Sequence, residues 1–330
     1  MLLHLAAILV VQAAASGPRA EPASGSPAAA PASASDMDEL WQEPRDLESR
    51  DLSLGPGGSA LLPDPGTEYL FEKEDTTGHT GGYEVRDPQG RKWDVKIGDE
   101  SRPEVVASRL LWAIGYHQPV TYFVPRWRMT GGPVDRPLPG RFRLESDHKK
   151  EGEWSWHDSP FAGSRPHRGL LIAEVLLNGW DFTANNNRIY RPKESGEGPA
   201  RWFVIQDLGA TLGKTRWPNG TIDDLEGFLS LGFVKRVHDD GRVVLDYHGR
   251  HRALLKDITA EDVVWTCGLL SRLSEEQLLD AFRAAGYPEA KRRAFVGKIR
   301  EKIREGLALA RMTPAARQVS GVMAQSRHGR

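Results

Sequence analysis

Strand patterns and helix patterns are segregated along this chain, and this separation restricts the fold more than any other feature. Residues 67–98 contain three short segments of strand type, joined by a glycine-bearing loop and a short turn. A helical repeat of apolar residues follows Pro103, and "PVTYFVPRW" at 119–127 predicts a further strand. Because the last third of the chain is mostly helical in pattern, we expect an α+β fold with a strand-rich N-terminal lobe and a mainly helical C-terminal lobe.

The middle of the chain adds one buried helix and a few strands. The segment "RGLLIAEVLLNG" at 168–179 is apolar on nearly all sides, which predicts a deeply buried helix. "NRIYR" at 187–191 and "RWFVIQ" at 201–206 predict strands, and a hairpin is expected within 140–156. The capping-box pattern "SEEQ" at 274–277 predicts the start of a C-terminal helix.

The first fifteen residues form an apolar run of about the length of a signal-peptide core. Ala13 and Ala15 give an A-x-A pattern at its end, although the run has no Lys or Arg at its start. We expect export from a bacterial cell, to the periplasm or outside; without a working leader the protein would be cytoplasmic. No later apolar run has membrane-spanning length, so we expect no membrane span in the mature protein.

Composition divides the chain into five parts. Residues 16–35 are almost entirely Ala, Pro, Ser and Gly, and the next thirty residues are acidic and broken by Gly-Pro pairs, so neither stretch is expected to be ordered. The expected parts are a signal peptide (1–15), a disordered linker (16–66), an N-lobe (67–127), a C-lobe (128–312) and a flexible tail (313–330).

Charge and cysteine content exclude some kinds of partner. The formal net charge is −1, and no basic face stands out, which argues against nucleic acid. The single cysteine, Cys267, excludes an intramolecular disulfide and a cysteine-rich metal site, and its apolar helical surroundings predict a core position. No H-x-x-x-H spacing occurs, so we predict no zinc site.

Oxygen-bearing side chains follow two of the predicted buried elements. In "GWDFTANNN", Asp181 and Asn186 stand five residues apart directly after the buried helix, and in "VIQDLG" Asp207 ends a strand. A carboxylate at Asp181 can orient or deprotonate a hydroxyl. Asn186 and Asp207 supply the hard oxygen ligands that Mg²⁺ prefers. Their neighbours Asn185 and Asn187 are expected to be turn residues that tolerate left-handed backbone angles.

A lysine, a glutamate and three glycines complete the candidate site. Lys96 lies on the third predicted strand and carries a positive charge, and Glu104, near the start of the next helix, could pair with it. Each residue alone has an ordinary structural explanation: a solvated lysine, a helix N-terminal charge and a hairpin loop. What favours a functional site is their combination in one order. The glycines, which let the backbone approach a ligand without Cβ clashes, are Gly78, Gly81 and Gly82.

This order of parts over residues 67–310 resembles the atypical branch of the protein-kinase-like superfamily, which includes HipA-type, phosphoinositide and secretory-pathway kinases. The D-x-x-x-x-N spacing resembles a kinase catalytic loop, and "DLG" resembles the DFG element. The resemblance implies a two-lobed fold, ATP and Mg²⁺ as cofactors, Asp181 as the catalytic residue, Lys96, Glu104 and the glycines at the nucleotide, and Asn186 and Asp207 at the metal.

Three departures from the kinase pattern keep an alternative open. Thr183 stands where that branch often has histidine, Gly179 and Trp180 precede Asp181 in place of His-Arg, and only eight positions separate Lys96 from Glu104. The alternative is a catalytically inactive pseudokinase, or an exported binding module. The acceptor stays open among a protein, a lipid head group and a small metabolite. Trp180 is expected to pack beside the catalytic loop.

Overall fold

The computed structural model describes residues 36–76, 81–133, 138–145, 148–193 and 198–312. The predicted leader 1–15, the linker residues 16–35 and the tail 313–330 lie outside these ranges, so export stays a prediction. Among the described residues, no helix is both long and apolar enough to cross a bilayer.

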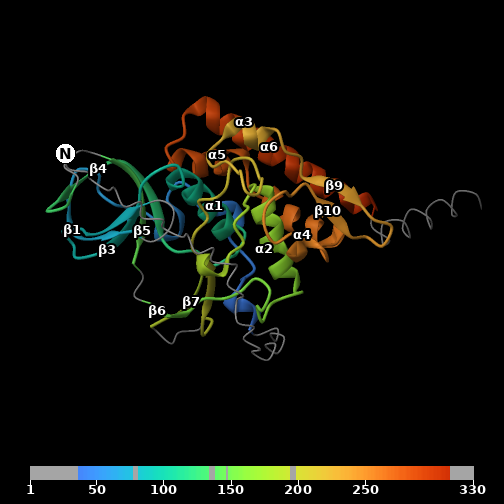
Figure 1. Cartoon of the computed structure of the whole chain (residues 1–330), viewed down its shortest axis with the longest axis horizontal. Coiled ribbons are helices and arrows are strands. Elements are labelled where there is room, and N and C mark those ends of the chain that lie inside the picture. The colour runs from blue at the N-terminus through green and yellow to red at the C-terminus, as the bar shows by residue number, and fades with distance from the viewer. Residues whose placement is uncertain (1–35, 77–80, 134–137, 146–147, 194–197, 313–330) are drawn as a thin grey trace, which may run out of the picture.

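Five strands close into a barrel at the N-terminal end of the molecule (Figure 1). They run in the spatial order β1-β2-β3-β5-β4, with β1 and β4 parallel and the other neighbours antiparallel. The strands are β1 (Glu68–Asp75), β2 (Gly82–Arg86), β3 (Lys92–Lys96), β4 (Thr121–Thr130) and β5 (Leu138–Leu144).

Side chains of β3 point alternately into the barrel and toward its outer face. Trp93 and Val95 are fully buried inside the barrel. Because side chains alternate along a strand, Lys92, Asp94 and Lys96 lie on the outer face. The interior is filled by eight buried residues, which are Tyr69, Val85, Trp93, Val95, Tyr122, Val124, Trp127 and Phe142.

Helix α1 (Ser101–Ala113) joins the barrel to the helical lobe. It lies between β3 and β4 in the chain and packs against β4, β5 and α5. Nearly all of its residues are buried, and its apolar side chains belong to the core of the helical lobe. The helices of that lobe are α2 (Arg165–Leu176), α3 (Leu225–Leu229), α4 (Ala260–Ser271), α5 (Glu275–Ala284) and α6 (Glu289–Ala308).

Two small antiparallel sheets accompany these helices. One contains β6 (Lys149–Gly152), β7 (Asn187–Arg191) and β8 (Trp202–Ile205), and the other contains β9 (Val234–Val237) and β10 (Val243–Leu245). Short 3-10 helices are η1 (Met37–Glu39), η2 (Leu47–Ser49), η3 (Gly55–Gly57), η4 (Ala184–Asn186), η5 (Arg252–Leu255) and η6 (Leu309–Met312).

The α+β architecture predicted from the sequence, with a strand-rich N-terminal lobe and a mainly helical C-terminal lobe, is confirmed. The capping box at Ser274 and Gln277 is present at the start of α5, and Cys267 is fully buried in the core. The lobe boundary near residue 127 is wrong, because β5 pairs with β3 and β4 and completes the barrel. The hairpin expected within 140–156 is also wrong, since β6 pairs with β7.

The prediction of disorder is wrong for residues 36–66. Leu40, Leu47 and Leu52 are fully buried in the main core. The Trp41 indole donates to the backbone oxygen of Ile114 (2.7 Å). Next to it, a Cβ on Gly115 would lie 2.1 Å from the backbone oxygen of Gln42. Three leucines anchor this acidic stretch in the core. Its average composition predicted disorder because it does not show where single apolar residues are buried.

Replacing Leu47 with alanine therefore tests whether this segment contributes to stability. We expect Leu47→Ala to lower the free energy of unfolding by about 2–5 kcal/mol, because it removes a fully buried side chain. Leu62→Ala is the control: its side chain is 47% exposed, so we expect a change within about 0.5 kcal/mol. Urea unfolding measures both, and equal effects would contradict the packing of this segment.

Candidate functional site

A cavity of about 540 Å³ between the barrel and the helical lobe brings together residues far apart in the sequence. Lys96, Asp181, Asn186 and Asp207 all line it, as does Gly82. Lys96 and Asp207 are 111 positions apart in the chain. Further charged residues in its wall are Asp75, Asp94, Glu100, Arg141, Arg143, Lys150 and Arg188.

Lys96 is held by three carboxylates. Its Nζ lies 2.8 Å from Asp207 Oδ1, 2.9 Å from Glu100 Oε2 and 3.3 Å from Glu104 Oε2. Burial alone would lower the pKa of Lys96, but the charges of Glu104 and Asp207 outweigh it and raise that pKa. Lys96 is therefore a permanent positive charge in the cavity, and the expected pair with Glu104 is present.

Two arginines of β5, Arg141 and Arg143, share the carboxylates of Asp94 and Glu104. Arg141 Nε lies 2.9 Å from Glu104 Oε1, and its Nη1 lies 3.1 Å from Asp94 Oδ1. Arg143 also pairs with Asp94 and lies 3.6 Å from Glu104. Burial would raise the pKa of Asp94, but the Arg143 and Arg141 charges hold it well below its usual range. The outer face of the barrel at the cavity is thus a fixed network of paired charges.

Asp181 and Asn186 contact each other across the short helix η4. Asn186 Nδ2 donates to Asp181 Oδ2 (3.2 Å), while Asp181 Oδ1 is buried and has no hydrogen-bond partner among the described residues. Burial raises the pKa of Asp181, although Asn186 and Arg250 act in the opposite direction. Asn186 therefore orients the Asp181 carboxylate at the edge of the cavity.

The pairing of β7 with β8 brings Asp207 to this loop. Asn187 is opposite Ile205 in the register, and the Asn186 backbone oxygen accepts from the amides of Gln206 (2.8 Å) and Asp207 (3.4 Å). Burial would raise the pKa of Asp207, but the Lys96 ammonium outweighs it and lowers that pKa. Asp207 is therefore an ionised carboxylate next to Asn186.

A fully buried lysine fixes the start of the Asp181 loop. Lys302 Nζ, from α6, donates to Asn178 Oδ1 (2.6 Å) and to the backbone oxygen of Leu176 at the end of α2 (3.0 Å). Asn178 has a φ of 59°, and its Nδ2 donates to the backbone oxygen of Gly213 (2.7 Å). These contacts tie α2, α6 and the segment after Asp207 together, so the loop has a fixed position.

The remaining predicted residues are three glycines and two asparagines. Gly82 lies opposite Lys96 in the β2–β3 register, whereas Gly81 does not line the cavity and Gly78 lies outside the described residues. Asn185 lines the cavity. The turn prediction is wrong for Asn187, which has extended backbone angles and donates to the Trp154 backbone oxygen at 3.0 Å.

The residues present fit a magnesium ion that is shared with phosphates. Among the described residues, no group of three or more His, Cys, Asp and Glu could hold a metal alone. Mg²⁺ in phosphate-binding sites commonly takes one or two protein carboxylates and completes its shell with phosphate oxygens and water. Asp207 with Asn186 offers such a partial set, and Asp181 lines the same cavity.

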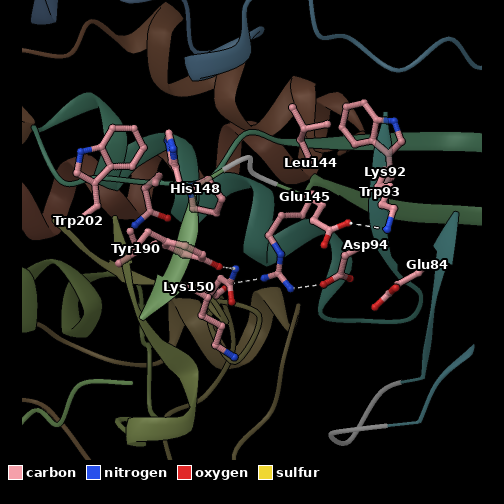
Figure 2. A pocket seen from close by; sticks show the side chains of 15 residues that line it. Glu84, Lys92, Trp93, Asp94, Leu144, Glu145, His148, Lys150, Tyr190 and Trp202 are labelled. Atoms are coloured by element: carbon pink, nitrogen blue, oxygen red, sulfur yellow. Dashed lines mark hydrogen bonds and ion pairs between the residues drawn. The ribbon is translucent and has the colours of Figure 1, made fainter. Parts of the chain in front are cut away.

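A second cavity of about 240 Å³ adjoins the first. Figure 2 shows Trp202, His148 and Tyr190 on one side of it and Asp94 on the other. Arg143 donates to the backbone oxygen of Gln206 (2.9 Å), which fixes the wall between the two cavities. Five residues line both, namely Asp94, Arg143, Lys150, Tyr190 and Gln206. The two cavities therefore adjoin along this wall, and together they are called the cleft below.

Sequence reasoning missed several residues of this cleft. Asp94 could have been found, because it shares a face of β3 with Lys96 at the two-residue period of a strand. Arg141 and Arg143 have the same two-residue spacing on β5, but that strand was not assigned to the barrel. Trp202 gave no signal, since its place depends on a sheet between distant segments.

Comparison with solved structures finds a similar fold in a bacterial kinase. The crystal structure of the Helicobacter pylori proinflammatory kinase CtkA is similar, with a TM-score of 0.46 and 11% sequence identity, over 74% of this chain and 98% of that chain. No protein-family model matches this chain, and no curated protein matches it.

Proposed function

We propose that this protein is an ATP- and Mg²⁺-dependent phosphotransferase of the atypical kinase-like type. The observation that supports this most is that Lys96, Asp181, Asn186 and Asp207 line one cavity. A second support is the Lys96–Glu104 ion pair, which holds the lysine in place. Phosphoryl transfer needs charge around the phosphates and a positioned oxygen near the acceptor, and this cavity provides both.

The chemistry follows from the place of each side chain. The acceptor hydroxyl donates its proton to the Asp181 carboxylate as its oxygen bonds to the γ-phosphorus, and the bond to the β–γ bridging oxygen breaks to release ADP. Lys96 offsets negative charge on the phosphates. Asn186 and Asp207 would hold Mg²⁺, which when bound supplies further positive charge to the phosphate oxygens.

The second cavity is the proposed site for the nucleotide base. Its wall contains Trp202, His148 and Tyr190, whose rings can contact a planar base. The Trp202 ring stacks on His117, with centroids 5.2 Å apart, and is met at its edge by His148. Because this cavity adjoins the first, a base placed here would lie beside the cavity that contains Lys96.

Nucleotide binding tests the proposal directly. We expect ATP with Mg²⁺ at about 100 times Kd to stabilise the folded protein by about 2.7 kcal/mol, seen as a rise in melting temperature. Asp207→Ala should lose this rise, because it removes a metal ligand. The control is Asp239→Ala, which changes an exposed aspartate on the β9–β10 turn and should keep it. No rise in the wild-type protein at millimolar nucleotide would refute the proposal.

One observation favours a second candidate function, a kinase-shaped binding module without turnover. Lys96 and Asp207 already neutralise each other at 2.8 Å within a network of paired charges, so these residues could serve the fold alone. Release of ADP from ATP distinguishes the two functions, because a binding module would give none.

A further inference from the structure

A third cavity, of about 350 Å³, lies on the helical lobe and is strongly basic. None of its residues lines the two cavities of the nucleotide cleft. It is formed by the chain that follows the Asp207 segment and by the turn after β10. We call it the basic pocket, and its lining residues are Lys214, Thr215, Arg216, Trp217, Leu231, His248 and Arg252.

Three cations of the basic pocket form no close ion pair among the described residues. No carboxylate lines it, and Lys214, Arg216 and Arg252 are exposed and form no ion pair within the described ranges. His248 is the exception, since it lies 2.9 Å from Asp246. Elsewhere in this lobe exposed arginines are commonly paired, as Arg272 is with Glu48 at 2.7 Å. Several unpaired cations around one hollow create a positive potential that attracts an anion.

An exposed tryptophan marks the mouth of the basic pocket. The Trp217 side chain is 50% exposed, which is unusual for so large an apolar group. The Arg250 guanidinium lies 4.3 Å from its ring centroid, and the Trp180 ring lies 6.5 Å away. Trp217 therefore offers an aromatic surface beside the cations, suited to the carbon skeleton of a polar ligand.

Short contacts connect the basic pocket to Asp181. Trp180 directly precedes Asp181, and the Tyr247 hydroxyl donates to the backbone oxygen of Arg250 (2.7 Å) and lies 3.3 Å from that of Trp180. Arg250 is also close enough to Asp181 to act on its charge. The basic pocket is thus joined to the Asp181 loop through Trp217, whose ring meets Trp180 and Arg250.

We infer that the basic pocket binds the phosphate group of a small hydroxylated phosphate ester, which is the acceptor. This identification of the acceptor rests on the proposed function, whereas binding of the anion does not. Arginine and lysine are the side chains that best recognise phosphate. The volume is at the lower end of small-molecule sites, about 300–1,000 Å³, which suits an ester of this kind better than a peptide segment.

Calorimetric titration of the full chain with glycerol 3-phosphate, without nucleotide, tests the binding. We expect saturable binding that weakens about tenfold or more in Arg216→Gln and in Arg252→Gln, because each loses a charged contact to the phosphate. Arg126→Gln, which changes an exposed arginine on β4 of the barrel, should bind as the wild type does. Uncharged glycerol should not bind. No binding at millimolar ester, or equal binding in the Arg216→Gln/Arg252→Gln double variant, would overturn the inference.

Two further experiments test whether the phosphate belongs to a lipid head group and whether an acidic peptide binds instead. The first measures sedimentation of the protein with phosphatidylcholine vesicles that contain phosphatidic acid. Sedimentation of the wild type, but not of the double variant, would assign the phosphate to a lipid head group. Tighter binding of poly-glutamate than of either phosphate would overturn the inference in favour of an acidic peptide. If ATP is bound and hydrolysed but no phosphate ester binds, this inference alone fails; if the ester binds and ATP does not, the proposed function fails.

Discussion

Asp181→Asn is expected to reduce ATP turnover by about 10²–10⁴-fold, the usual contribution of a positioned general base. The substitution keeps the shape of the side chain and removes its ability to accept the acceptor proton. The wild-type carboxylate lines the cavity, where an acceptor hydroxyl can reach it. Release of ADP measures the turnover, and calorimetric titration with ATP and Mg²⁺ should show binding largely unchanged.

The control for this prediction is Asp158→Asn. Asp158 is an exposed aspartate of the same lobe that does not line the cleft, so its turnover should equal that of the wild type. Turnover in Asp181→Asn that stays within twofold of the wild type would show that Asp181 is not the base. Loss of both turnover and ATP binding would instead assign Asp181 to nucleotide binding.

The parts of the fold that sequence reasoning predicted correctly are those with local signals. The two-residue period identified β3 and placed Lys96 on it, and the apolar run before Asp181 identified α2. Asp207 was found because it directly follows a strand. The convergence of these residues was expected from their order, and the cavity now places them together.

The parts that were missed depend on contacts between distant segments. Closure of the barrel needs β1 to pair in parallel with β4, more than fifty positions later, and no local pattern encodes that pairing. Gln42 lies against Gly115 for a similar reason, since the N-terminal segment packs on the end of α1. Single leucines in an acidic stretch do not show where they will be buried.

Glu104→Gln is expected to lower the free energy of unfolding by about 3–5 kcal/mol, as removal of one partner from a buried ion pair typically does. Glu104 is 1% exposed, and it holds both Arg141, also 1% exposed, and Lys96. The substitution keeps the volume of the side chain, so any cost comes from charge. Arg141 would keep Asp94 as a partner, but its Nε would face a neutral amide at a buried position.

The matched control is Glu84→Gln on the neighbouring strand β2. Glu84 also pairs with a lysine, Lys73 at 2.7 Å, but both side chains are more than a third exposed. Pairs of this kind contribute about 0–1 kcal/mol, so little change is expected. Urea unfolding at neutral pH compares the two variants. Equal small effects would mean that water reaches the Glu104 network and screens it, and Lys96 would then not be rigidly placed for phosphates.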